Sequence, residues 1–141
     1  DVVGSCTDLL APGAGPRPGT TLGGMTTQQA LGRAGEALAA EHLTAAGMRL
    51  VRANWRCRDG EIDLLMRDGD SLVAVEVKTR TSLNAGHPFE AITARKASRL
   101  RSLVRQAAAD LGHRGSIRVD AVAILLPPDA AALLEHLKGI A

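Results

Sequence analysis

The chain has 141 residues, a formal net charge of +2, an apolar fraction of 45% and a charged fraction of 23%. This length supports one domain with its own core, and the mild basicity permits a nucleic-acid partner without requiring one. Trp55 and Phe89 are the only aromatic residues, which argues against the base-stacking platforms of single-strand-binding proteins. Cys6 and Cys57 give neither a disulfide framework nor a zinc site, and no apolar run approaches the ~20 residues of a membrane span. We therefore expect a cytoplasmic protein with no membrane partner.

The N-terminal segment differs in composition from the rest of the chain. Residues 1–24 contain six Gly and three Pro without periodicity, which predicts a disordered leader. Met25 opens the first patterned segment and is a candidate for the natural start. We expect the folded domain to comprise residues 25–141.

A first helix is predicted from about Thr27 to Ala46. Thr26 and Gln29 fit a capping box at its start, and Gly47 fits a stop at its end. Glu36 lies on the flank of the apolar stripe of this helix, and from the sequence pattern alone a solvated glutamate is the favoured interpretation.

The next segments predict strands. Residues 48–55 are expected to form a first strand, and residues 60–80, GEIDLLMRDGDSLVAVEVKTR, a β-hairpin whose turn contains Asp68-Gly69. One face of this hairpin is wholly apolar and must pack against a core. The predicted pairs on that face are Met66 with Val73, Leu64 with Val75, and Ile62 with Val77.

The other face of the hairpin carries charges. It places Asp63 opposite Glu76 and Glu61 opposite Lys78, beside the pair Leu65 and Ala74. Two carboxylates placed opposite each other repel, and a divalent cation would offset the repulsion. The alternative is a cross-strand ion pair between Glu61 and Lys78 on a solvated face. From the residues alone, the two interpretations carry about equal weight.

The second half of the chain alternates loop, helix and strand. Residues 79–88 predict a mobile loop, with His87 close to the charged face. A second helix is expected over 93–111, followed by a strand over 117–126, while the structure of 129–141 is left open. Phosphate contact and an ordinary solvated surface are both compatible with the basic run on the second helix. That run is Arg95, Lys96, Arg99, Arg101 and Arg105.

An ordered set of short strings resembles a known family. The strings are Gly35-Glu36, Asn54-Trp55-Arg56, GEIDLL, VAVEVKTR, Gly86-His87-Pro88 and Arg118-Val119-Asp120. Together they resemble the YraN family of small bacterial proteins, whose fold is similar to that of archaeal Holliday-junction resolvases. Asp63 followed by Glu76-Val77-Lys78 is similar to the D…ExK core of the PD-(D/E)xK nuclease superfamily.

The resemblance implies a fold and a set of roles. The fold is α/β, a single restriction-endonuclease-like domain with a central mixed sheet flanked by helices and the core order αβββαβ. Asp63 and Glu76 would bind Mg²⁺ or Mn²⁺, with the Val77 backbone carbonyl as a neutral ligand and Glu36 as an auxiliary one. Lys78 would position the attacking water and the phosphate.

The expected function is Mg²⁺-dependent endonuclease cleavage of structured or branched DNA. Two alternatives stay open: a non-catalytic nucleic-acid-binding module that keeps the fold, and a protein-interaction adaptor. The choice between DNA and RNA and the presence of a homodimer are also open. The residues expected to contact phosphates are Arg56, Arg80, Arg95, Lys96 and Arg99.

Overall fold

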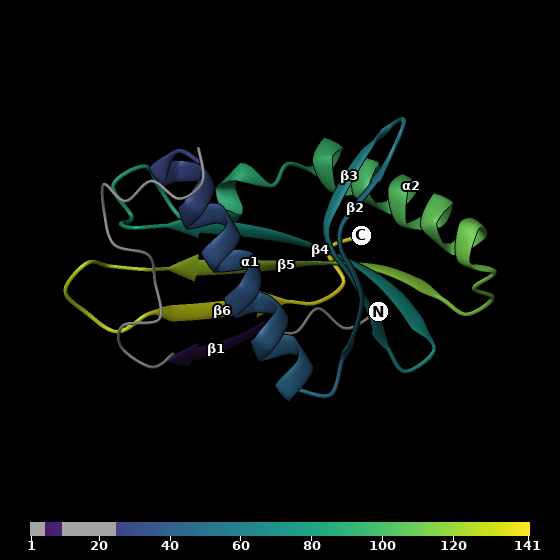
Figure 1. The fold of residues 1–141 in the computed structure, drawn as a ribbon, viewed down its shortest axis with the longest axis horizontal. Coiled ribbons are helices and arrows are strands. Elements are labelled where there is room, and N and C mark those ends of the chain that lie inside the picture. Colours follow the sequence, from purple (N-terminus) through teal and green to yellow (C-terminus); the bar gives the residue numbers. More distant parts are fainter. Residues whose placement is uncertain (1–4, 10–24) are drawn as a thin grey trace.

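The computed structural model describes residues 5–9, as backbone, and 25–141. Figure 1 shows the elements in chain order. They are β1 (Ser5–Leu9), α1 (Thr27–Ala45), β2 (Arg49–Cys57), β3 (Gly60–Asp68), β4 (Ser71–Arg80), the 3-10 helix η1 (Pro88–Ala91), α2 (Ala94–Leu111), β5 (Ile117–Leu125) and β6 (Leu133–Leu137). The strands form one sheet in the order β1-β6-β5-β4-β3-β2. Only the β4–β5 pair is parallel among the described strands.

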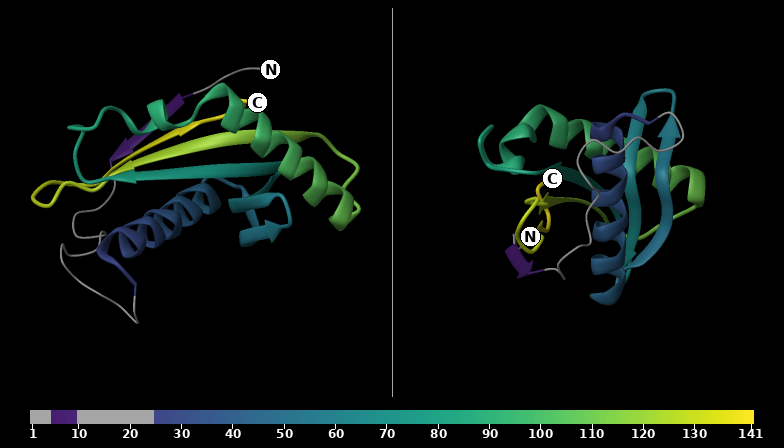
Figure 2. Two further views of the ribbon diagram at one scale, coloured as in Figure 1. Left: turned by 90° about the horizontal axis from the view of Figure 1, so that it is seen from above. Right: turned by 60° about the vertical axis from the view of Figure 1, so that its left-hand side comes forward.

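The predicted fold class is confirmed as an α/β domain with a mixed sheet flanked by helices, and α1 to β5 follow the core order αβββαβ. Helices α1 and α2 cover opposite faces of the sheet (Figure 2). Alternation along the strands divides the apolar side chains between these faces. Leu64 and Val75 pack in a core beneath α1, whereas Leu65 and Ala74 pack in a core beneath α2. We refer to these as the α1-side core and the α2-side core.

Local signals at the helix ends act as expected. The Thr26 side chain accepts from the Gln29 N–H at 3.1 Å and completes a capping box. Thr93 caps α2 by accepting from the Lys96 N–H, also at 3.1 Å. Gly112 ends α2 in the left-handed conformation (φ 66°), which glycine adopts without steric cost. No helix in the described part of the chain is long and apolar enough to cross a membrane.

The predicted hairpin register is confirmed from the turn as far as Leu64, which lies opposite Val75. The prediction for Ile62 was wrong. Its side chain packs in the α2-side core rather than with Leu64. The reason lies at Asn54, whose left-handed backbone (φ 53°) kinks β2 between the partners of Leu64 and Ile62 and so changes the alternation of side chains. Beyond this kink, Ile62 and its partner Trp55 face the other side of the sheet.

Both ends of the described chain add strands to the predicted core. Leu133–Leu137 forms β6, which settles the structure left open for part of residues 129–141. Ser5–Leu9 forms β1 and pairs antiparallel with β6, which differs from the leader without structure expected over residues 1–24. Pairing at a sheet edge uses backbone groups, so it needs no patterned apolar face. The rest of that leader, residues 1–4 and 10–24, lies outside the described residues.

Candidate functional site

A cleft of about 680 Å³ opens between the start of α2 and strands β3 and β4. It collects most of the residues that were predicted to act together: Glu36, Asp63, Glu76, Val77, Lys78, Arg95, Lys96 and Arg99. Four elements supply them. Glu36 comes from α1, Asp63 from β3, residues 76–78 from β4, and Arg95, Lys96 and Arg99 from α2. The cleft therefore contains carboxylates from the sheet and cations from a helix.

Asp63 and Glu76 form the centre of this cleft. The Asp63 carboxylate accepts the Val77 N–H at 2.9 Å, just beyond the point where the β3–β4 backbone pairing ends. Its carboxyl group lies within hydrogen-bonding reach of Glu76, so the two groups can share a proton. Burial and this contact with Glu76 raise the pKa of Asp63 to about 8. At neutral pH the proton therefore resides on Asp63, and the pair carries one negative charge.

Two lysines offset the remaining charge of Glu76, whose side chain is only 6% exposed. Lys96 Nζ lies 2.6 Å and Lys78 Nζ 3.5 Å from Glu76 Oε2. Burial alone would raise the pKa of Glu76, but hydrogen bonds from Asp63 and Lys96 outweigh it and leave the pKa lowered. Burial, followed by the neighbouring Lys96, lowers the pKa of Lys78. In this structure the shared proton and the two ammonium groups perform the charge compensation that the sequence suggested for a cation.

Glu36 reaches the cleft because α1 lies unusually close to β4. A Cβ atom added at Gly35 would overlap Thr79 Oγ1, so only glycine permits this approach. Thr79 Oγ1 itself is buried without a hydrogen-bond partner among the described residues. Burial raises the pKa of Glu36, and the negative charges of Glu61 and Glu76 add to the rise. The sensitivity of Glu36 to Glu76 shows that it belongs to the same electrostatic site.

The donor set fits Mg²⁺ through two carboxylates. Mg²⁺ in proteins is commonly held by one or two carboxylates, with water and substrate phosphate as its other ligands. Asp63 and Glu76 provide such a pair on adjacent strands. Within residues 25–141 no three His, Cys, Asp or Glu side chains lie together as a preformed metal cage. Glu36 is therefore not grouped with the pair, and its role as an auxiliary ligand stays a prediction.

Some predicted residues lie elsewhere. Arg56 forms an exposed ion pair with Glu61 at 3.0 Å, so the alternative cross-strand pair of Glu61 with Lys78 is not formed. Arg80 donates to the Thr79 carbonyl oxygen at 3.1 Å and does not line the cleft. His87 caps η1 and lies 4.0 Å from Glu135 of β6.

A buried polar cluster at Asp120 went unrecognised in the sequence. Asp120 is fully buried and accepts from Arg118 Nε at 2.8 Å, from the Gly139 N–H at 3.0 Å, and pairs with His136 Nε2 at 2.9 Å. Burial would raise the pKa of Asp120, but these partners outweigh it and keep the pKa low. The cluster connects β5 to β6. The sequence signal that could have revealed it is an acidic residue, Asp120, within the apolar run of β5.

Comparison with known sequences gives a family. The sequence model described as "Uncharacterised protein family UPF0102" matches residues 35–124. A UPF0102 protein of Beutenbergia cavernae is 49% identical over 82% of this chain and 99% of its own length. The corresponding values are 54%, 82% and 98% for a protein of Clavibacter michiganensis, and 48%, 83% and 92% for one of Streptomyces coelicolor. The matched region contains the whole of the carboxylate and lysine set.

Proposed function

The chain belongs to the uncharacterised protein family UPF0102, the YraN family, and on that premise we propose that it is a Mg²⁺-dependent endonuclease acting on structured or branched DNA. The family description assigns no activity, so the proposal depends on the cleft itself. The observation that carries it is the meeting of two partly buried carboxyl groups, Asp63 and Glu76, with Lys78 in one cleft at the end of a strand pairing.

Two carboxyl groups held close together in a partly buried site lower the stability of the fold, so their presence needs a functional explanation. A partly buried carboxyl pair lowers stability at neutral pH, because the ionised member loses hydration and the other must keep a proton that it would release in water. A purely structural face would be more stable with one of them replaced by an apolar residue. Metal ligation would give the pair a function, since Asp63 and Glu76, with the shared proton released, would together hold a divalent cation. When bound, the ion supplies Lewis-acid stabilisation of phosphate charge.

The side chains around the pair match the other needs of phosphodiester hydrolysis. Lys78 lies beside Glu76 and carries a lowered pKa, so it can exchange a proton with a water molecule more readily than an ordinary lysine. Arg95, Lys96 and Arg99 line the same cleft from α2 and would hold the phosphates on either side of the reacting one. In this proposal Lys96 exchanges its present contact with Glu76 for a phosphate oxygen.

One observation favours a second candidate, a nucleic-acid-binding module without catalysis. Lys96 Nζ is 2.6 Å from Glu76 Oε2, a direct contact on the oxygen that a metal ion would need. If this ion pair persisted when substrate was bound, Glu76 would serve only to position a phosphate-binding lysine. The protein would then bind DNA with a steep salt dependence and leave it intact.

A cleavage panel separates the two candidates. Four-way junctions, forks, duplexes and single strands are incubated with the protein in Mn²⁺, in Mg²⁺ and in EDTA, beside a Glu76→Ala variant. The nuclease proposal predicts incision of at least one substrate that needs metal and disappears in the variant. Binding of the whole panel without incision in either metal would select the second candidate instead.

A further inference from the structure

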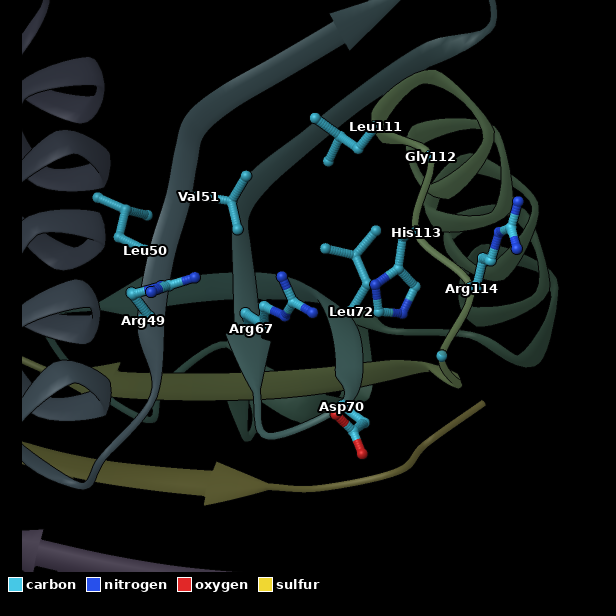
Figure 3. A pocket seen from close by; sticks show the side chains of 11 residues that line it. Arg49, Leu50, Val51, Arg67, Asp70, Leu72, Leu111, Gly112, His113 and Arg114 are labelled. Carbon is cyan, nitrogen blue, oxygen red and sulfur yellow. The ribbon is translucent and has the colours of Figure 1, made fainter.

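A second cavity lies at the opposite end of α2 from the cleft. It has a volume of about 700 Å³ and is called the distal pocket here. Its walls are the start of β2, the end of β3, the start of β4 and the loop after α2 (Figure 3). The lining of the distal pocket includes Arg49, Arg67, Asp70, Leu72, His113 and Arg114.

Two arginines face each other in this pocket. Arg49 and Arg67 are direct cross-strand partners, a placement in which like charges destabilise a sheet. Neither guanidinium has a hydrogen bond or ion pair with any described residue. Charges on an edge strand commonly serve to prevent pairing between sheets. That explanation suits Arg49 on the edge strand β2, but not Arg67, because β3 is paired on both sides.

The rest of the lining gives the two arginines little compensation. Arg114 lines the pocket from the loop after α2, but its guanidinium is directed away from Arg49 and Arg67 (Figure 3). His113 Nε2 lies 2.9 Å from the Ser116 carbonyl oxygen, which fixes the ring at the pocket wall. Among the described lining residues Asp70 is the one acid. The pocket thus has the charge of a site for an anion.

The distal pocket and the cleft lie at opposite ends of α2, on the same face of the sheet. Lys96, in the first turn of α2, lines the cleft, and Leu111, in the last turn, lines the distal pocket. The 18 residues of α2 span about 27 Å, at about 1.5 Å per residue. Arg52 is exposed between the two cavities, and its cross-strand partner Leu65 packs in the α2-side core, so both cavities and Arg52 lie on one face.

We propose that the distal pocket binds a backbone phosphate of a duplex arm whose reacting phosphate lies in the cleft. The inference rests on the proposed function and adds a requirement on the substrate. Since a duplex rises about 3.4 Å per base pair, a separation of about 27 Å corresponds to about eight base pairs. The substrate class is therefore nucleic acid with a duplex arm of at least about eight base pairs on one side of the cleavage point.

The test is a binding measurement in EDTA, so that it does not depend on cleavage. Fluorescence anisotropy compares duplex stems of about six and about sixteen base pairs, each closed by a hairpin loop, for the wild type and Arg49→Ala/Arg67→Ala. On the long stem the variant should lose about tenfold or more in affinity, and the salt dependence should flatten by one to two phosphate contacts, a change of roughly 1–2 in slope. On the short stem the two proteins should bind alike.

Arg101→Ala/Arg105→Ala is the matched control, because it removes two charges from α2 residues that line neither cavity. The inference is overturned if this control loses as much on the long stem, or if the pocket variant loses equally on both stems. Cleavage without the length effect would remove this inference alone, and the length effect without cleavage would remove the nuclease proposal alone.

Discussion

At the scale of single residues, the cleft is defined by competition for the oxygens of Glu76. Lys96 and Lys78 contact one of those oxygens, and Asp63 shares a proton with the carboxyl group. Under the proposed function a metal ion would have to displace at least the proton, because a protonated carboxyl group is a poor ligand. The proposed metal binding is therefore coupled to proton binding at Asp63.

This coupling predicts how metal binding depends on pH. Because the pKa of Asp63 is raised to about 8, its affinity for Mg²⁺ or Mn²⁺ should fall by up to about tenfold per unit as the pH drops below that value. A metal at a hundredfold excess over its Kd stabilises the native state by about 2.7 kcal/mol. The rise in melting temperature with metal should hence be larger at about pH 8.5 than at about pH 6.5.

Without metal, the contribution of Asp63 to stability should change with pH in the opposite direction. The folded state holds the Asp63 proton more tightly than the unfolded chain, in which the pKa of Asp63 is near 3.8. The free energy of unfolding therefore decreases as the pH rises from 3.8 towards 8.

Two variants test whether the rise in melting temperature with metal comes from the cleft. Glu76→Ala should abolish this metal increment, while Glu41→Ala, at an exposed acid on α1, should keep it. A metal increment that is independent of pH, or equal in all three proteins, would contradict the assignment.

At the scale of elements, the contact between α1 and β4 sets the position of Glu36. Gly35→Ala should destabilise the fold by about 1–3 kcal/mol, because the new Cβ overlaps Thr79 Oγ1. Gly32→Ala, in the same helix with nothing within 4 Å, should instead stabilise it by up to about 1 kcal/mol. Urea unfolding measures both, and similar effects of the two substitutions would disprove the close approach.

The junction of β5 and β6 rests on Asp120. Asp120→Asn should lower the free energy of unfolding by about 3 kcal/mol or more, since it removes the buried negative charge that pairs with Arg118. The pKa of Asp120 is lowered, so its stabilising effect is present above the unfolded pKa of 3.8 and is lost as the pH falls below it. Asp129→Asn, at an exposed position, should change stability by less than about 0.5 kcal/mol. Equal denaturant midpoints for both variants would refute the role of the cluster.

The elements themselves were largely predictable because their signals are local. Thr26 with Gln29 and the Asp68-Gly69 turn each fix an end or a register from a few neighbouring residues. The switch of Ile62 to the α2 side was not predictable, because it depends on an unusual φ at Asn54 that no pattern reveals. Strand β1 escaped prediction because it is defined by the free edge of β6.

The site was predicted in composition but not in its contacts. Asp63, Glu76 and Lys78 could be grouped by hairpin register and resemblance, because they lie on adjoining strands. The contact of Lys96 with Glu76 depends on how α2 packs across the sheet, a tertiary relation without a sequence signature. The same packing creates the distal pocket.

At the scale of the whole molecule, α2 lies across one face of the sheet and connects two basic regions (Figure 2). The central claim is that the cleft at its N-terminal end performs catalysis as well as binding. Lys78 tests this claim because it touches Glu76 directly, whereas most phosphate contacts are assigned to α2. A residue that acts on the transition state changes rate more than affinity.

The decisive measurement is the single-turnover cleavage rate of the wild type and Lys78→Ala on one branched duplex, with the affinity of each protein for the same DNA. We predict that the variant binds nearly as well but cuts roughly 10²–10³-fold more slowly, the effect of losing one oriented cationic donor. Arg95→Ala/Arg99→Ala should show the reverse, with weaker binding and a smaller effect on the rate of bound substrate. A wild type that binds this DNA but does not cut it with metal, with Lys78→Ala losing affinity alone, would contradict the claim.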